Sequence, residues 1–178
     1  RCPMKKLMTL LFVLPSLVFG DVNFSDFFEN KTMRLDYFHT GTATVEIFSL
    51  DQVYEEGEWP GTRTRLNNPI DAGLYKYQVF DQESGDLIFA QGYNSIFGEW
   101  QTTSDAINNI HATMHETVRF PWPQKAVRVS ISKRDRNNTF NELWSTDIDP
   151  NSRFVNREQK AYPFKVNKYV DNGDPSNK

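Results

Sequence analysis

Two histidines in this chain have the spacing of metal ligands on a helix. His111 and His115 lie four residues apart, but a zinc peptidase helix needs glutamate directly after the first histidine, and Ala112 stands there. If residues 111–120 form a β-strand, both histidines point to one face but lie too far apart to chelate one ion easily. A third ligand would have to be His39 or a carboxylate. The pattern favours partly exposed strand histidines over a metal site.

An acidic turn and the possible nucleophiles are the next candidates. Residues 81–86 resemble half of a calcium loop, but the apolar run that follows lacks the bidentate glutamate that closes such a loop. We therefore predict a hairpin turn. The sequence has no Gly-x-Ser-x-Gly elbow and no Gly-rich phosphate loop. Adjacent Glu55 and Glu56 indicate a solvated face rather than an acid/base pair. These residues do not make a catalyst.

The four tryptophans are the remaining candidates, because exposed aromatic rings can hold sugars by stacking. We consider Trp59, Trp100 and Trp122 as possible ligand-facing aromatics. Tryptophans in a chain of this kind are more often core and loop anchors, and Trp144 lies on a strand pattern. Both interpretations stay open at this point.

The elements that must position these residues are mainly strands. In three stretches, residues 112–120, 127–131 and 140–148, most apolar residues fall on positions of one parity, which is typical of half-buried strands. Glu116 is the exception in the first stretch. Prolines at 121 and 123 end that strand because they cannot donate to a ladder. We predict that the three strands form an antiparallel meander.

Earlier segments add two hairpins and a few helical turns. Strands are expected at 32–39 and 43–47, and again at 74–80 and 87–92. Residues 24–29 fit one helical turn capped by Ser25, and we favour their interpretation as an apolar plug that ties the N-terminus to the core. We expect a short helix at 102–110, begun by Thr103 or Ser104. Residues 50–58 have a helical, acidic pattern, and 63–73 form a loop. Together these elements predict an all-β fold, a mainly antiparallel β-sandwich with one or two helical turns.

Composition and the N-terminus bear on location. With Lys plus Arg 20 against Asp plus Glu 23, the chain lacks the basic excess of a nucleic-acid binder. Residues 1–20 resemble a signal peptide, with residues 1–3 upstream of the start at Met4, and are too short for a transmembrane helix. We expect an exported protein, secreted, periplasmic or on the cell surface, with no membrane span after signal removal. The sole cysteine, Cys2, lies in that segment, so the mature chain builds no disulfide.

Four stretches together resemble a known family. Residues 27–41, 92–103, 116–123 and 148–150 are similar to the N-terminal domain of IgA-protease-type zinc metallopeptidases of gut Bacteroidetes. This resemblance implies a β-sandwich accessory domain, here residues 21–166, followed by a separate peptidase domain with a His-Glu-x-x-His helix. Residues 167–178 resemble the linker toward that domain.

The zinc motif itself does not occur in this sequence. We therefore expect no catalytic residue, metal ligand or cofactor in this chain, and zinc only in a catalytic domain outside it. The chain is then a truncated product, a fragment or a stand-alone copy of the accessory domain. Our hypothesis is a non-catalytic domain that packs in cis on the C-terminal peptidase domain or orients it or its substrate. The alternative is a free-standing secreted binding module for glycans or a host glycoprotein.

Overall fold

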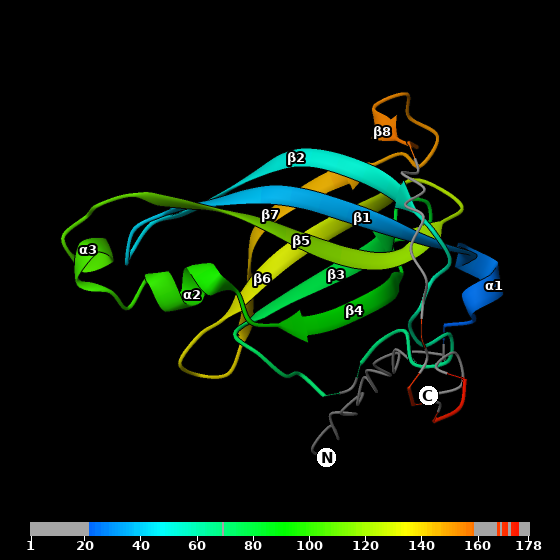
Figure 1. Cartoon of the computed structure of the whole chain (residues 1–178), viewed down its shortest axis with the longest axis horizontal. Helices are drawn as coiled ribbons and strands as arrows, with labels where there is room; N and C mark the ends of the chain where they lie inside the picture. The colour runs from blue at the N-terminus through cyan, green and yellow to red at the C-terminus, as the bar shows by residue number, and fades with distance from the viewer. Residues whose placement is uncertain (1–21, 69, 159–166, 168, 171, 175–178) are drawn as a thin grey trace, which may run out of the picture.

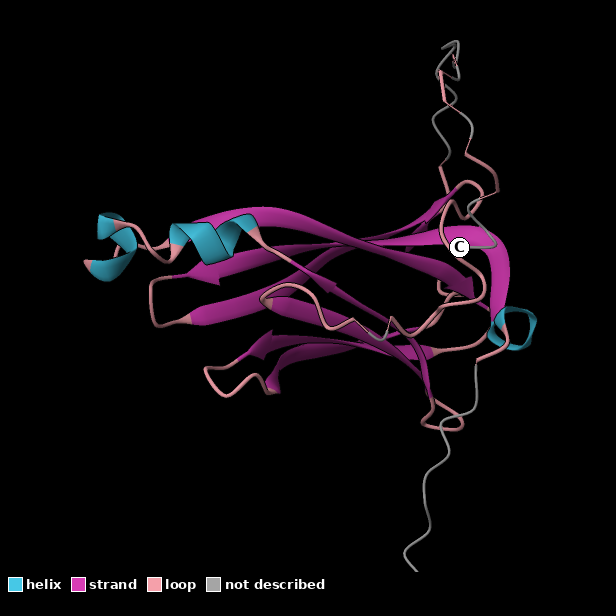
Figure 2. Cartoon of the chain, turned by 90° about the horizontal axis from the view of Figure 1, so that it is seen from below, coloured by secondary structure: helices cyan, strands magenta, loops and turns pink. Residues whose placement is uncertain are grey.

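The computed structural model describes residues 22–68, 70–158, 167, 169–170 and 172–174. In this part of the chain two sheets pack face to face (Figures 1 and 2). The strand order is β5-β1-β2-β8 in the first sheet and β4-β3-β6-β7 in the second. The predicted all-β sandwich is confirmed. The predicted signal peptide, residues 1–20, and half of the predicted linker, 167–178, lie outside the described residues.

The chain crosses between the two sheets after β2, β4, β5 and β7. The first sheet holds β1 (Phe28–Gly41), β2 (Glu46–Glu56), β5 (Ala112–Pro123) and the short β8 (Val155–Asn156). The second holds β3 (Tyr75–Asp81), β4 (Leu87–Tyr93), β6 (Val127–Arg134) and β7 (Phe140–Ile148). Neighbouring strands are antiparallel, except that β8 pairs parallel with β2. Hairpins β1–β2, β3–β4 and β6–β7 confirm the predicted hairpin pairs, although β2 begins only at Glu46.

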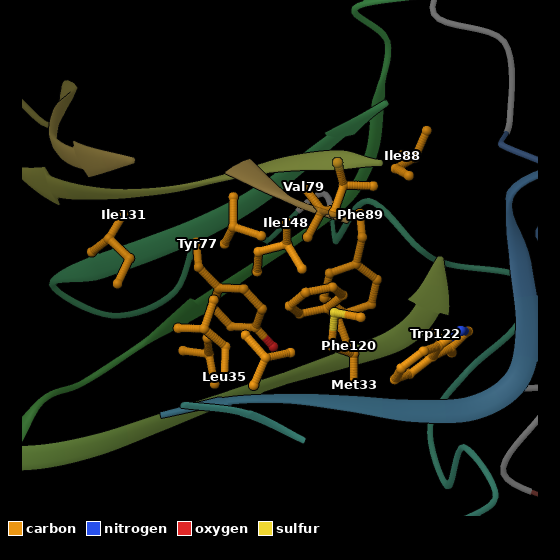
Figure 3. Close-up of a cluster of buried hydrophobic side chains, with 14 of the residues drawn as sticks. Met33, Leu35, Tyr77, Val79, Ile88, Phe89, Phe120, Trp122, Ile131 and Ile148 are labelled. Carbon is orange, nitrogen blue, oxygen red and sulfur yellow. The ribbon is translucent and has the colours of Figure 1, made fainter. Parts of the chain in front are cut away.

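The core lies between the two sheets, because alternate residues of each strand face inward. On β1, the inward positions 33, 35, 37 and 39 are all fully buried. Figure 3 shows side chains of the first sheet meeting those of the second: Met33, Leu35 and Phe120 on one side, and Tyr77, Val79, Phe89 and Ile131 on the other. Aromatic rings fill much of this space.

The predicted three-strand meander is wrong. Only β6 and β7 form a hairpin, while β5 pairs with β1 and β6 pairs with β3. The connection after β5 crosses from one sheet to the other, with the backbone N–H of Gln124 donating to the carbonyl of Phe27. The alternation of residues identifies a strand but not its neighbour, since pairing depends on distant segments.

The predicted helical stretch at residues 50–58 is also wrong, since most of it belongs to β2. Its acidic residues pair with cations of neighbouring strands rather than with residues one turn away. Glu56 accepts hydrogen bonds from Arg34 of β1 at 2.8 Å and from Arg119 of β5 at 2.8 Å. Cross-strand pairing of this kind outweighs a local helical preference.

Three short helices lie at the ends of the sandwich. The helical turn considered near residue 24 exists as α1 (Phe24–Phe27), but Asn23 rather than Ser25 stands at its N-cap position. The predicted helix start at Thr103 is confirmed, because that side chain caps α3 (Ser104–Ile107). The sequence did not predict α2 (Ile96–Trp100). Helices α2 and α3 lie at one end, beyond the strands of the second sheet (Figure 1). No helix in the described residues is long and apolar enough to span a bilayer.

Candidate functional site

A buried polar cluster lies where α2 meets the end of the sandwich. We call it the His39 cluster: His39 of β1, Glu46 of β2, Glu116 of β5 and Lys133 of β6. His39 and the two glutamates lie at inward-facing positions of the long strands. Glu116 is the residue that breaks the apolar alternation of β5, so the exception in the pattern marks the cluster.

His39 is enclosed on every side. Its Nδ1 lies 3.3 Å from a carboxylate oxygen of Glu116, and its Nε2 lies 3.1 Å from one of Glu46. The rings of Phe48 and Phe97 stack on the imidazole with centroids 4.0 and 3.8 Å away, so they must occupy opposite faces. The side chain has no exposed surface.

The two carboxylates collect further donors from other elements. Glu46 accepts from the Tyr75 hydroxyl at 2.9 Å and from the Gln101 amide at 3.1 Å, and it pairs with the Lys133 ammonium. Glu116 accepts from the Ser95 hydroxyl at 2.5 Å and from the Tyr37 hydroxyl at 3.1 Å. Through these contacts the cluster connects β1, β2, β3, β5 and β6 with the residues that cap α2.

The electrostatics of the cluster favour charged groups in spite of burial. Burial opposes the imidazolium, but hydrogen bonds to Glu116 and Glu46 outweigh it and raise the pKa of His39. Burial likewise opposes ionisation of Glu46, but hydrogen bonds from His39 and Lys133 lower its pKa to about 2. The pKa of Glu116 is lowered against burial too, chiefly by its hydrogen bond with His39. Two carboxylates therefore face two cations.

This arrangement is suited to holding elements together rather than to chemistry on a substrate. A catalytic acid or base must reach the proton that it transfers, and His39 is sealed between two phenylalanine rings and two carboxylates. The residues that the structure describes contain no group of three or more His, Cys, Asp or Glu arranged to hold a metal ion.

The two histidines with helical spacing lie on the other side of the first sheet. His111 is exposed just before β5, and His115 lies on β5 itself, half exposed, 3.0 Å from a carboxylate oxygen of Asp51. Its ring packs on Phe38 at 5.0 Å. His39 points into the core instead, so the structure does not bring it to the other two. The prediction of exposed strand histidines is confirmed for His115.

The acidic segment 81–86 forms the predicted hairpin turn. The backbone N–H of Ser84 donates to the carboxylate of Asp81 at 2.8 Å, and Gly85 takes a φ of +77°. That φ is one that glycine adopts without strain.

The structure separates the three tryptophans considered as ligand-facing aromatics. Trp59 and Trp122 are buried. The Trp59 indole donates to the carbonyl of Thr62 at 3.0 Å and meets Phe89 edge to face. Trp100 is partly exposed, on α2 at the opposite end of the sandwich from Trp122 (Figure 1). Trp144 packs against the core. The three rings do not form one exposed platform.

Two open clefts run along the sides of the sandwich, between the edge strands of the two sheets. One, of about 330 Å³, lies between β4 and β5 and includes Trp59, Tyr77, Tyr93 and Arg119. The other, of about 350 Å³, lies beside β2, β7 and β8, and we call it the β2–β7 cleft. Its apolar lining residues are Leu50, Val53, Ile148, Phe154 and Val155.

The β2–β7 cleft combines apolar surface with negative charge. Phe154 is 74% exposed and Leu50 is 42% exposed, while Asp51, Asp147 and Asp149 also line the cleft. Sequence reasoning missed this surface, because its residues come from segments about 100 positions apart. An exposed large aromatic ring beside other apolar groups is a feature of interaction surfaces.

Comparison with known proteins identifies the family of the chain. No curated protein matches it. The family model described as "Peptidase M64 N-terminus" matches residues 23–145, which span all of the strands from β1 to β6 and most of β7. The expected resemblance to IgA-peptidase-type N-terminal domains is confirmed. The chain therefore belongs to the peptidase M64 N-terminus family.

Proposed function

We propose that this chain is a non-catalytic accessory domain of an exported zinc metallopeptidase and that it packs on the peptidase domain or orients it or its substrate. The observation that carries this proposal is the family match over residues 23–145. The His39 cluster agrees with it, because His39 has no exposed surface and lies between two carboxylates, so its ring is not open to a substrate.

The β2–β7 cleft is the surface that we assign to the peptidase domain. Val155 of β8, the last strand in the described residues, lines it. Its exposed Phe154 offers an apolar anchor of the kind that dominates protein interfaces. The three aspartates of the cleft would complement a basic rim on the other domain.

The alternative of a glycan-binding module has less support. Sugar stacking needs an open indole face, and Trp59 and Trp122 are buried. Trp100 and Trp144 keep part of their surface exposed, but Trp144 packs against the core.

The experiment measures binding of the chain to an isolated M64 peptidase domain by calorimetry. Phe154→Asp should weaken binding by at least tenfold, because it places a charge at the centre of the apolar contact. Leu143→Asp is the control, since Leu143 is 42% exposed on β7 but does not line the cleft. Equal binding by both variants would refute the choice of surface.

Activity and ligand assays test the function itself. The purified chain should hydrolyse no protein and should bind no zinc by elemental analysis. Hydrolysis together with stoichiometric zinc would overturn the proposal. Binding to a glycan array, with none to the peptidase domain, would favour the alternative module.

A further inference from the structure

The hydrogen bonds of His39 require a proton on each of its ring nitrogens. A carboxylate oxygen only accepts, and one faces Nδ1 at 3.3 Å while another faces Nε2 at 3.1 Å. A neutral imidazole has one N–H, so one of its nitrogens would turn a lone pair toward a carboxylate. The buried ring is therefore satisfied only as an imidazolium.

We propose that His39 is a pH-sensitive lock: as an imidazolium between Glu46 and Glu116 it holds residues 94–110 on the sandwich, and loss of its proton releases them.

Deprotonation of His39 would destabilise the cluster at Glu116. Glu116 accepts from the hydroxyls of Ser95 and Tyr37 and from the N–H of Phe97, and it contacts the His39 ring. His39 is the cation among these partners. Glu46 keeps the Lys133 ammonium whatever the state of His39. When His39 becomes neutral, Glu116 is left as a buried carboxylate without that cation, which is strongly unfavourable.

Other titratable groups around the ring do not take over this role. The tyrosine hydroxyls of β1, β3 and β4 that face the cluster belong to Tyr37, Tyr75 and Tyr93. Burial raises the pKa of each well above its usual value of 10, so they remain neutral donors. Lys133 on β6 bonds to Glu46 and Gln101 and does not reach Glu116.

Residues 94–110 are attached through this cluster and through contacts outside it, such as the Leu74 N–H donating to the Asn94 side-chain oxygen at 2.9 Å. Ser95, which caps α2, and Phe97, which follows it, both bond to Glu116. Gln101, at the end of α2, bonds to Glu46 and to the carbonyl of Thr42. Another hydrogen bond of this segment bypasses the cluster: the N–H of Ala43 donates to the carbonyl of Ala106. The segment also carries Ile96, Ile107 and Ile110, each more than half exposed. Loss of the proton would therefore move an apolar surface.

The sign of the effect follows from the direction of the shift. The pKa of His39 is raised in the folded protein, so the lock is complete below the ordinary histidine value of 6.5 and opens as the pH rises through the raised value.

Nuclear magnetic resonance of the whole chain tests the proposal. The ¹⁵N shifts of the His39 ring should show both nitrogens protonated at pH 6. On raising the pH, amide protection in residues 94–110, corrected for base-catalysed exchange, should fall at least tenfold as His39 titrates. Protection in β3 and β6 should stay unchanged over that range. His115→Gln is the matched control, because it removes an exposed strand histidine and should leave the transition in place.

Three results would overturn the lock. A neutral His39 ring at pH 6 would remove its basis. Titration of His39 with constant protection in residues 94–110 would show that the proton does not hold them. Loss of protection in β3 and β6 at the same pH would show global unfolding instead of local release. Since all of these are measured on the unaltered chain, the test does not depend on a variant that folds.

Discussion

Replacing Glu116 by glutamine tests most directly how much the charges and hydrogen bonds of the His39 cluster contribute to stability. The side chain keeps its size but loses its charge, and one of its two terminal atoms becomes an NH₂ group that cannot accept. In one orientation the Ser95 hydroxyl and the Phe97 N–H lose their acceptor; in the other, the Tyr37 hydroxyl and the His39 ring do. Either way, His39 keeps only Glu46 as a counter-charge.

The expected loss of stability is large for an isosteric change. Removing one partner of a buried ion pair costs about 3–5 kcal/mol. Because Glu46 still faces the imidazolium, we expect the lower end, about 3 kcal/mol. For a chain of this size this lowers Tm by roughly 6–12 °C. Urea unfolding at pH 7, followed by tryptophan fluorescence and circular dichroism, measures the free energy of unfolding.

Glu142→Gln is the matched control for this prediction. Glu142 also pairs with a cation, Arg128, at 2.9 Å, but both side chains are about half exposed. An exposed pair contributes little, so the free energy of unfolding should change by less than about 1 kcal/mol. Equal effects of Glu116→Gln and Glu142→Gln would refute the reasoning, since burial of the cluster would then carry no energetic weight.

Three further predictions concern acid, a close contact and the core. The pKa of Glu46 is lowered to about 2, so its contribution to stability is complete above the ordinary value of 4.5 and is lost as the pH falls toward 2; urea midpoints at pH 7, 4 and 2.5 should decline in that order, and a constant midpoint would contradict it. Gly92→Ala should destabilise by about 1–3 kcal/mol, because its Cβ would lie 1.8 Å from a backbone carbonyl oxygen. Gly57→Ala, whose Cβ would have no atom within 4 Å, should cost little, and thermal melts of the two variants measure the difference. Phe120→Ala should cost about 3–5 kcal/mol, since Phe120 is fully buried, and Phe154→Ala, at a largely exposed position, should stay within about 0.5 kcal/mol by urea titration; similar losses for both would contradict the described core.

The strands were predictable from the sequence because their signal is local. More buried and more exposed residues alternate along β3 and along β5 up to Phe120, and that alternation can be read without knowing which strand lies alongside. The helix start at Thr103 was predictable for the same reason, since a cap bonds to the next turn of its own helix.

The errors arose where distant residues overrule a local pattern. The acidic run at residues 50–58 has a helical pattern, but β1 and β5 supply the cations that Glu56 needs as a strand residue. Helix α2 was missed because its five residues have little tendency to form a helix alone. It is held by Glu116 and by the stacking of Phe97 on His39.

Local patterns in the chain were enough to predict an all-β sandwich and to place Glu116 at an apolar position of its strand. The folded arrangement was needed to place β5 in the first sheet, to bring Glu116 to His39 from 77 positions away, and to bury Trp59 and Trp122. The difference lies in the range of the interactions. Alternation and capping act between near neighbours, whereas the pairing of strands and the neutralisation of a buried charge depend on groups that only the folded chain brings together.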